Sequence, residues 1–377
     1  MMALPLRSRH DLIRFQTLKE AIKGEARYEY NWFQFFGLKK DPTDSVPVTA
    51  DFDANLVDRQ AEIKMIAMIL ASAAKGSSAI VTLVGPEGSG RTSLANFLMH
   101  LNTLATPQNI EILAVPMREL VMYKPDRISD FFTERVPKDT NLLMLDDCED
   151  LGSTLADIVR ESVVRQSLKF IVTSPAHLLA LRERDESVAQ WKVITVKPLT
   201  ERDAVSFLRG VIMRSLEEDS RYASLVESEA VLKTIYASGM GVPGLMLKLL
   251  RQSFLLAYNK DMRLLDKASV VEAAAKGGYE DAVRHLTKSK LSEKLFETLL
   301  ALHLTTNFLL GPQGYDGATA NQLEEDLEVD RSTVVHYLSQ LHEKGLVTKR
   351  KHGRLVYYKV PQPAQVAVEL DCIKRTA

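Results

Sequence analysis

The feature that most constrains the fold is a glycine-rich segment that directly follows a short apolar run. The apolar run is Ala79–Val84, and the segment after it is Gly85-Pro86-Glu87-Gly88-Ser89-Gly90-Arg91-Thr92. Apolar residues then recur at helical spacing from Leu94 to Leu101. A strand, a glycine loop and a helix in this order match the P-loop pattern GxxxxGK[ST], whose backbone N–H groups surround a phosphate at the positive end of the helix. The segment therefore predicts an α/β fold with a nucleotide site.

One position departs from this pattern, because Arg91 stands where lysine is expected. A guanidinium is a wide planar fork, whereas an ammonium is a point charge, so we expect phosphate binding to persist and the contact with the transition state to be misplaced. The hydroxyl of Thr92 is expected to hold Mg²⁺. The alternative is a glycine-rich turn without a ligand. The candidate ATP/ADP-binding residues in this segment are Gly85, Gly88, Ser89, Gly90, Arg91, Thr92 and Ser93.

Four more strand-length apolar runs follow, separated by enough chain for helices. They are Ile110–Val115, Leu142–Leu145, Phe170–Val172 and Val193–Val196. Continuous apolarity is typical of strands that are buried on both faces of a parallel sheet. We therefore predict a five-stranded parallel α/β core that ends near Pro198, followed by helical periodicity over residues 199–285.

Polar residues follow two of these strands and extend the candidate site. Asp146 and Asp147 end the third run, where the first acid is expected to bind Mg²⁺ and the second to orient or deprotonate the attacking water. Thr173 and Ser174 follow the fourth run, at the edge where open α/β sheets contact ligands. Either hydroxyl is a candidate sensor of a γ-phosphate, and ordinary capping at the end of a strand is the alternative.

The C-terminal part has the pattern of a helix-turn-helix. A helix over residues 318–329 is followed by Asp330, which can cap a second helix, Arg331–Lys344. Val334, Leu338 and Leu341 lie on one face of this helix and are expected to pack inward. The opposite face carries the candidate DNA-binding residues Ser332, Thr333, His336, Tyr337, Gln340 and Lys344.

Two predicted strands, residues 346–350 and 354–360, follow and are joined by a basic turn, which completes a winged helix-turn-helix. The second helix suits a major groove of double-stranded DNA, and the wing cations suit phosphates. The alternative is a winged helix that makes protein contacts only, because Glu324, Glu325, Asp326 and Glu328 on the first helix would repel DNA. The wing cations are Lys349, Arg350, Lys351 and Arg354.

Together these segments resemble AAA+ ATPases, in particular the archaeal origin-recognition and cell-division-control initiators and their STAND relatives. The resemblance implies that the segment Leu56–Glu62 lines an adenine pocket, with Val57 and Arg59 as contacts. It also implies an arginine near Gly241-Val242-Pro243-Gly244 that would reach the γ-phosphate, but Gly244 stands there. Lys248 and Arg251 are partial substitutes, and Arg160 and Arg165 are candidates for an arginine finger.

Composition places these parts in an ordinary globular protein. The chain has 377 residues, 46% of them hydrophobic, and a formal net charge of -1, so nucleic-acid contact must come from a local patch. Two cysteines indicate a reducing compartment, and no apolar run approaches a membrane span. We expect a cytoplasmic protein, associated with the nucleoid if it binds DNA. The expected units are an aromatic-rich extension (1–45), the core (46–198), a helical lid (199–285), the winged helix (286–361) and a C-terminal tail (362–377).

The leading hypothesis is an ATP-binding, AAA+-type DNA-binding protein that resembles replication initiators. Its nucleotide state would set how the winged helix engages duplex DNA, and ATP hydrolysis, for which Asp147 and Arg91 are the catalytic candidates, stays open. The alternative is a regulatory or scaffold protein with a degenerate P-loop, which acts through protein contacts or as a transcriptional regulator. Self-association and further protein partners stay open under both hypotheses.

Overall fold

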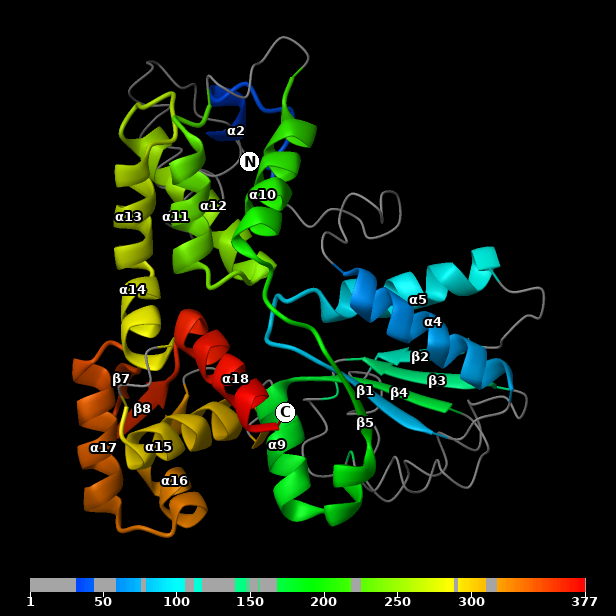
Figure 1. Cartoon of the computed structure of the whole chain (residues 1–377). Helices are drawn as coiled ribbons and strands as arrows, with labels where there is room; N and C mark the ends of the chain where they lie inside the picture. Colours follow the sequence, from blue (N-terminus) through cyan, green and yellow to red (C-terminus); the bar gives the residue numbers. More distant parts are fainter. Residues whose placement is uncertain are drawn as a thin grey trace, which may run out of the picture.

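A parallel sheet forms the centre of one unit of the molecule, which lies to the right in Figure 1. The structure is a computed structural model and describes residues 32–43, 59–75, 79–105, 112–116, 140–146, 148, 155, 168–217, 225–287, 291–309 and 317–376. The sheet has five parallel strands in the order β2-β3-β4-β1-β5, which confirms the predicted core. The strands are β1 (Ile80–Val84), β2 (Ile112–Pro116), β3 (Leu142–Asp146), β4 (Leu168–Thr173) and β5 (Lys192–Thr195).

Helices cover both faces of this sheet, as the unbroken apolarity of its strands requires. Helices α4 (Gln60–Ala74) and α5 (Arg91–Ala105) pack on one face, where Ile66 and Leu94 meet Leu83. Helix α9 (Pro175–Arg184) and the 3₁₀ helix η3 (Glu186–Gln190) pack on the other face. The P-loop follows the carboxyl end of β1, an inner strand of the sheet that lies between β4 and β5.

The lid is a separate helical unit with its own apolar core. The N-terminal extension carries an aromatic cluster of Tyr28, Tyr30, Trp32, Phe33, Phe35 and Phe36. Its described helix, α2 (Trp32–Phe35), packs into this core, where Trp32 stacks on Phe254 with 5.5 Å between ring centroids. Tyr28 and Tyr30 of that cluster lie outside the described residues. The lid helices are α10 (Glu201–Ser215), α11 (Glu229–Ser238), α12 (Pro243–Asn259) and α13 (Lys267–Lys276).

The C-terminal unit is a winged helix, as predicted. Its three-stranded sheet has the order β6-β8-β7, and β7 and β8 form the antiparallel wing. Its elements are α14 (Tyr279–Ala282), the π-helical turn η5 (Val283–Thr287), α15 (Glu293–Leu304), the π-helical turn η6 (Thr305–Leu309), β6 (Ala318–Thr319), α16 (Ala320–Leu327), α17 (Arg331–Glu343), β7 (Thr348–His352), β8 (Leu355–Lys359) and α18 (Gln362–Thr376).

The segment expected as a tail is the helix α18, and it lies between the units (Figure 1). Val366 packs into the lid core, whereas Ala367 and Val368 pack into the core of the winged helix. Ala282 and Leu286 belong to that same core, so η5 packs with the winged helix. Within the described parts of the chain, no helix is long and apolar enough to span a membrane.

Candidate nucleotide site and DNA-binding surface

The P-loop has the backbone conformation that its glycines permit. Gly88 has a φ of +78° and Gly90 a φ of +95°, in the region that L residues rarely adopt. The N–H of Ser89 donates to the carbonyl of Pro86 at 3.0 Å, and α5 begins at Arg91 directly after the loop. The first N–H groups of a helix have no intrahelical acceptor, so those of α5 lie at this loop. Thr92 is exposed, whereas Arg91 and Ser93 are half-buried.

Arg59 is buried beside the P-loop, whereas the family resemblance implied only a contact with adenine. Its guanidinium donates to the carbonyl of Lys197 at 2.7 Å and to the carbonyl of Ser89 at 3.2 Å. Glu62, one turn along α4, is its ion-pair partner at 3.5 Å. Arg59 therefore ties the P-loop to the segment that leads into the lid. Val57, the other predicted contact, lies outside the described residues.

The polar groups at the strand ends have local roles. Ser174 is buried and caps α9, because its Oγ accepts from the backbone N–H of His177 at 3.1 Å. The hydroxyl of Thr173 is 2.7 Å from Nδ1 of the same histidine. The capping alternative is therefore observed for Ser174, and its contact with a phosphate stays a prediction. Asp146 ends β3 and is half-buried, which suits its predicted role as a Mg²⁺ ligand.

One catalytic candidate and both arginine-finger candidates are not placed. Asp147, Arg160 and Arg165 lie outside the described residues, so their roles stay predictions from the sequence.

Gly244 brings the lid directly onto the P-loop. It lies in the first turn of α12, and its backbone N–H donates to the carbonyl of Gly88 at 2.9 Å. A Cβ atom on Gly244 would lie 2.7 Å from Cα of Gly88, closer than any side chain can pack. The backbone approach explains why glycine stands where the resemblance implies an arginine. An arginine at this position is excluded while the lid keeps this contact.

The two cations proposed as substitutes for that arginine are engaged elsewhere. Arg251 forms an ion pair with the buried carboxylate of Asp41 at 3.0 Å, which holds the N-terminal segment on the lid. Lys248 donates to Oε1 of Gln362 at 2.5 Å, and Nε2 of Gln362 donates to Oε1 of Glu87 at 3.0 Å. Glu87 belongs to the P-loop and Gln362 begins α18. These two hydrogen bonds therefore connect the core, the lid and the C-terminal helix.

The predicted recognition helix α17 has the predicted inward face, since Val334, Leu338 and Leu341 are buried. Its first turn is organised by Asp330, which accepts hydrogen bonds from the N–H and hydroxyl groups of both Ser332 and Thr333. These hydrogen bonds hold the pKa of Asp330 well below its usual range. The two hydroxyls, predicted as DNA contacts, thus already donate to the cap.

The rest of the outward face carries side chains that suit base edges or phosphates. His336 is exposed, and its Nε2 is 2.7 Å from Nε2 of Gln340. Tyr337, Gln340 and Lys344 are half-buried. The structure therefore brings most of the predicted contacts together on one side of α17.

The wing gathers the four predicted cations on one hairpin. Every residue of β7 is exposed, including Lys349, Arg350 and Lys351. Arg354 is exposed beside Gly353, whose φ of +62° makes the tight turn. Such a cluster gives a local basic patch on a chain that is nearly neutral overall.

Sequence comparison finds a related family in the C-terminal unit. Residues 314–363 match the family described as "Sugar-specific transcriptional regulator TrmB". Over 86% of this chain and 90% of the relative, the sequence is 22% identical to an uncharacterized HTH-type transcriptional regulator of Methanocaldococcus jannaschii.

Structure comparison finds archaeal ORC proteins. The ORC2 protein of Aeropyrum pernix is similar with a TM-score of 0.46 and 16% identity, over 90% of this chain and 99% of that protein. The Aeropyrum pernix ORC1 protein, solved in complex with DNA, has a TM-score of 0.45 and 18% identity, over 88% and 97% of the two chains. At these identities the likeness concerns the fold alone.

Proposed function

We propose that this chain is an ATP-binding, AAA+-type protein that binds duplex DNA through its winged helix, with nucleotide state setting that engagement. The DNA-binding part is supported by the basic wing, by the exposed face of α17 and by the match of residues 314–363 to a family of transcriptional regulators. Four wing cations that approach phosphates would make the affinity fall steeply with salt concentration. A cytoplasmic location, with association to the nucleoid, belongs to the same proposal.

The residues around the P-loop suit a Mg²⁺-bound nucleotide. The positive φ values of Gly88 and Gly90 shape a concave loop, and α5 begins at its end. In the proposal the backbone from Gly88 to Ser93 and the side chain of Arg91 hold the phosphates. Thr92 and Asp146 hold Mg²⁺. The nucleotide supplies a γ-phosphate whose presence or loss distinguishes two states, and slow hydrolysis with Asp147 at the water is part of the proposal.

The observation that carries the coupling is the hydrogen bond between Gln362 and Glu87 at 3.0 Å. Glu87 lies in the P-loop, and α18, which begins at Gln362, packs into the winged-helix core through Ala367 and Val368. A ligand that binds one arrangement of the P-loop more tightly shifts the population toward that arrangement. Through α18, such a shift would change the position of the winged helix.

Fluorescence anisotropy of a labelled duplex, titrated across a salt series with and without Mg-ATP, tests this proposal. We expect salt-sensitive binding whose affinity changes with Mg-ATP. In Glu87→Ala the change with Mg-ATP should disappear while DNA binding persists. The matched control is Glu186→Ala, an exposed glutamate on η3. Salt-sensitive binding that is indifferent to ATP in the wild type would refute the coupling, and no binding at low salt would refute the whole proposal.

The second candidate is a regulator with a degenerate P-loop that acts without hydrolysis. The contact between Gly244 and Gly88 favours it, because it excludes the arginine that the resemblance implies at the γ-phosphate. A steady-state ATPase assay separates the two candidates. Hydrolysis above background that is lost in Asp147→Asn eliminates the second candidate. No hydrolysis in the wild type or in Arg91→Lys supports it.

A further inference from the structure

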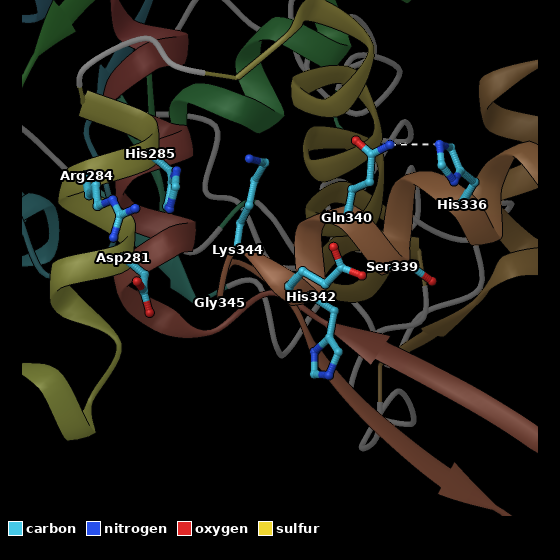
Figure 2. A pocket seen from close by; sticks show the side chains of 10 residues that line it. Asp281, Arg284, His285, His336, Ser339, Gln340, His342, Lys344 and Gly345 are labelled. Carbon is cyan, nitrogen blue, oxygen red and sulfur yellow. Dashed lines mark hydrogen bonds between the residues drawn. The ribbon is translucent and has the colours of Figure 1, made fainter.

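A polar groove with a volume of about 820 Å³ lies between η5 and α17 (Figure 2). One wall carries Arg284 and His285 from the π-helical turn, and the other carries His336, Gln340 and Lys344 from the recognition helix. In Figure 2 the side chain of Lys344 extends between these walls. π-Helical turns of this kind occur frequently at functional sites. The groove therefore joins the predicted DNA-reading face to residues outside the helix-turn-helix.

The two walls are held together as one body. Gly345 follows α17 with a φ of +72°, and a Cβ atom there would lie 2.5 Å from Oδ2 of Asp281, so the glycine lets α14 approach. On the inner side, Ala282 and Leu286 pack into the same apolar core as Leu338. Both walls of the groove therefore rest on the apolar core of the winged helix.

The groove presents two cations and several N–H donors that can meet the oxygens of an anion. Arg284 is exposed and Lys344 is half-buried, so a cation on each wall is accessible to a ligand. The imidazoles of His285 and His336 and the amide of Gln340 add N–H donors. Two carboxylates, those of Asp281 and Glu343, also line the groove, and the first lies against Gly345.

We propose that this groove holds the phosphodiester backbone of duplex DNA, with Arg284 and His285 as phosphate contacts. The inference rests on the proposed DNA binding by α17. A helix in a major groove about 12 Å wide lies between two phosphate strands, and protein groups beside the helix meet them. Half or more of protein–DNA hydrogen bonds go to phosphate and sugar and set the register of the helix. On this account η5 positions α17 on the duplex, and the wing supplies a separate set of phosphate contacts.

The salt dependence of DNA binding tests this inference with Arg284→Gln. Loss of one phosphate contact should reduce the slope of log K against log salt concentration by about one, equally for duplexes of different sequence. The double variant Arg284→Gln/Lys344→Gln should reduce it by about two. Arg184→Gln, an exposed arginine on α9, is the matched control, and Lys351→Gln is the matched variant in the wing. Circular dichroism melting of each variant confirms that the fold is kept.

The outcomes separate this inference from the proposed function. If Lys351→Gln reduces the slope while Arg284→Gln leaves it at the wild-type value, the groove inference is wrong and DNA binding stands. If the wild type does not bind duplex DNA at low salt, both fail together. A reduced slope in Arg284→Gln and an unchanged slope in Arg184→Gln support the groove.

Discussion

Replacing Gly244 by alanine tests the contact between the lid and the P-loop with a single methyl group. The φ of Gly244 is not in the left-handed region, so the backbone conformation permits alanine and only the room available for its Cβ limits the substitution. An alanine in a helix is more stable than glycine by about 0.5–1 kcal/mol, which predicts a gain. The added Cβ would lie 2.7 Å from Cα of Gly88, where backbone on both sides must shift. Overpacking of this kind costs about 1–3 kcal/mol, so we expect a net loss of about 1 kcal/mol.

Amide hydrogen exchange measures this loss at the contact itself. The N–H of residue 244 donates to the carbonyl of Gly88, so opening of the lid exposes it. A loss of about 1 kcal/mol corresponds to roughly fivefold faster exchange at this amide. The midpoint of urea unfolding gives the same free energy for the lid as a whole.

Gly210→Ala is the matched control for this prediction. Gly210 lies within α10, and the nearest atom to its added Cβ is the flexible end of Arg214 at 3.1 Å. This variant should be neutral or gain up to about 1 kcal/mol from helix propensity alone. If Gly244→Ala is stabilised as much as Gly210→Ala and its amide exchanges no faster, the inferred contact does not limit the space at Gly244.

Three further predictions concern buried or capped charges. Lys169 is buried in β4, and burial lowers its pKa to about 8. Between about pH 8 and 10.5 the unfolded state therefore binds more protons than the folded state, so the stability of the wild type rises with pH over that window. Lys169→Met should lack this rise, and at pH 7 its free energy of unfolding, measured with urea, should exceed that of the wild type by up to about 3 kcal/mol. An equal rise with pH in both proteins would contradict this prediction. The hydrogen bonds that lower the pKa of Asp330 stabilise the winged helix above the unfolded carboxyl pKa of about 4, and this contribution is lost as the pH falls. In melts monitored by circular dichroism, the melting temperature of Asp330→Asn should therefore fall less at acid pH than that of the wild type. Arg59→Lys should cost about 1–3 kcal/mol in urea unfolding, because an ammonium lacks the fork that reaches both Lys197 and Ser89; an unchanged midpoint would show that these bonds contribute little.

The sequence by itself determined the strands of the parallel sheet and the elements of the winged helix-turn-helix. The five apolar runs became the five parallel strands, because strands that are buried on both faces of a sheet are predominantly apolar. The wing and the helix α17 followed from equally local patterns, as in the inward spacing of Val334, Leu338 and Leu341. Each of these signals lies within a few consecutive residues, where the spacing of the apolar residues alone indicates which face is buried.

The tertiary structure decided which distant groups meet at the site. Gly244 and Gly88 are far apart in sequence, and only their backbone contact explains the glycine in the lid. The segment from Gln362 looked like a tail, yet as α18 it links the P-loop to the winged helix. Arg284 gave no signal, because a single exposed arginine carries no periodicity, and it becomes notable only across the groove from Lys344. Local sequence encodes burial and hydrogen bonding within an element, whereas the approach of two backbones depends on how whole elements pack.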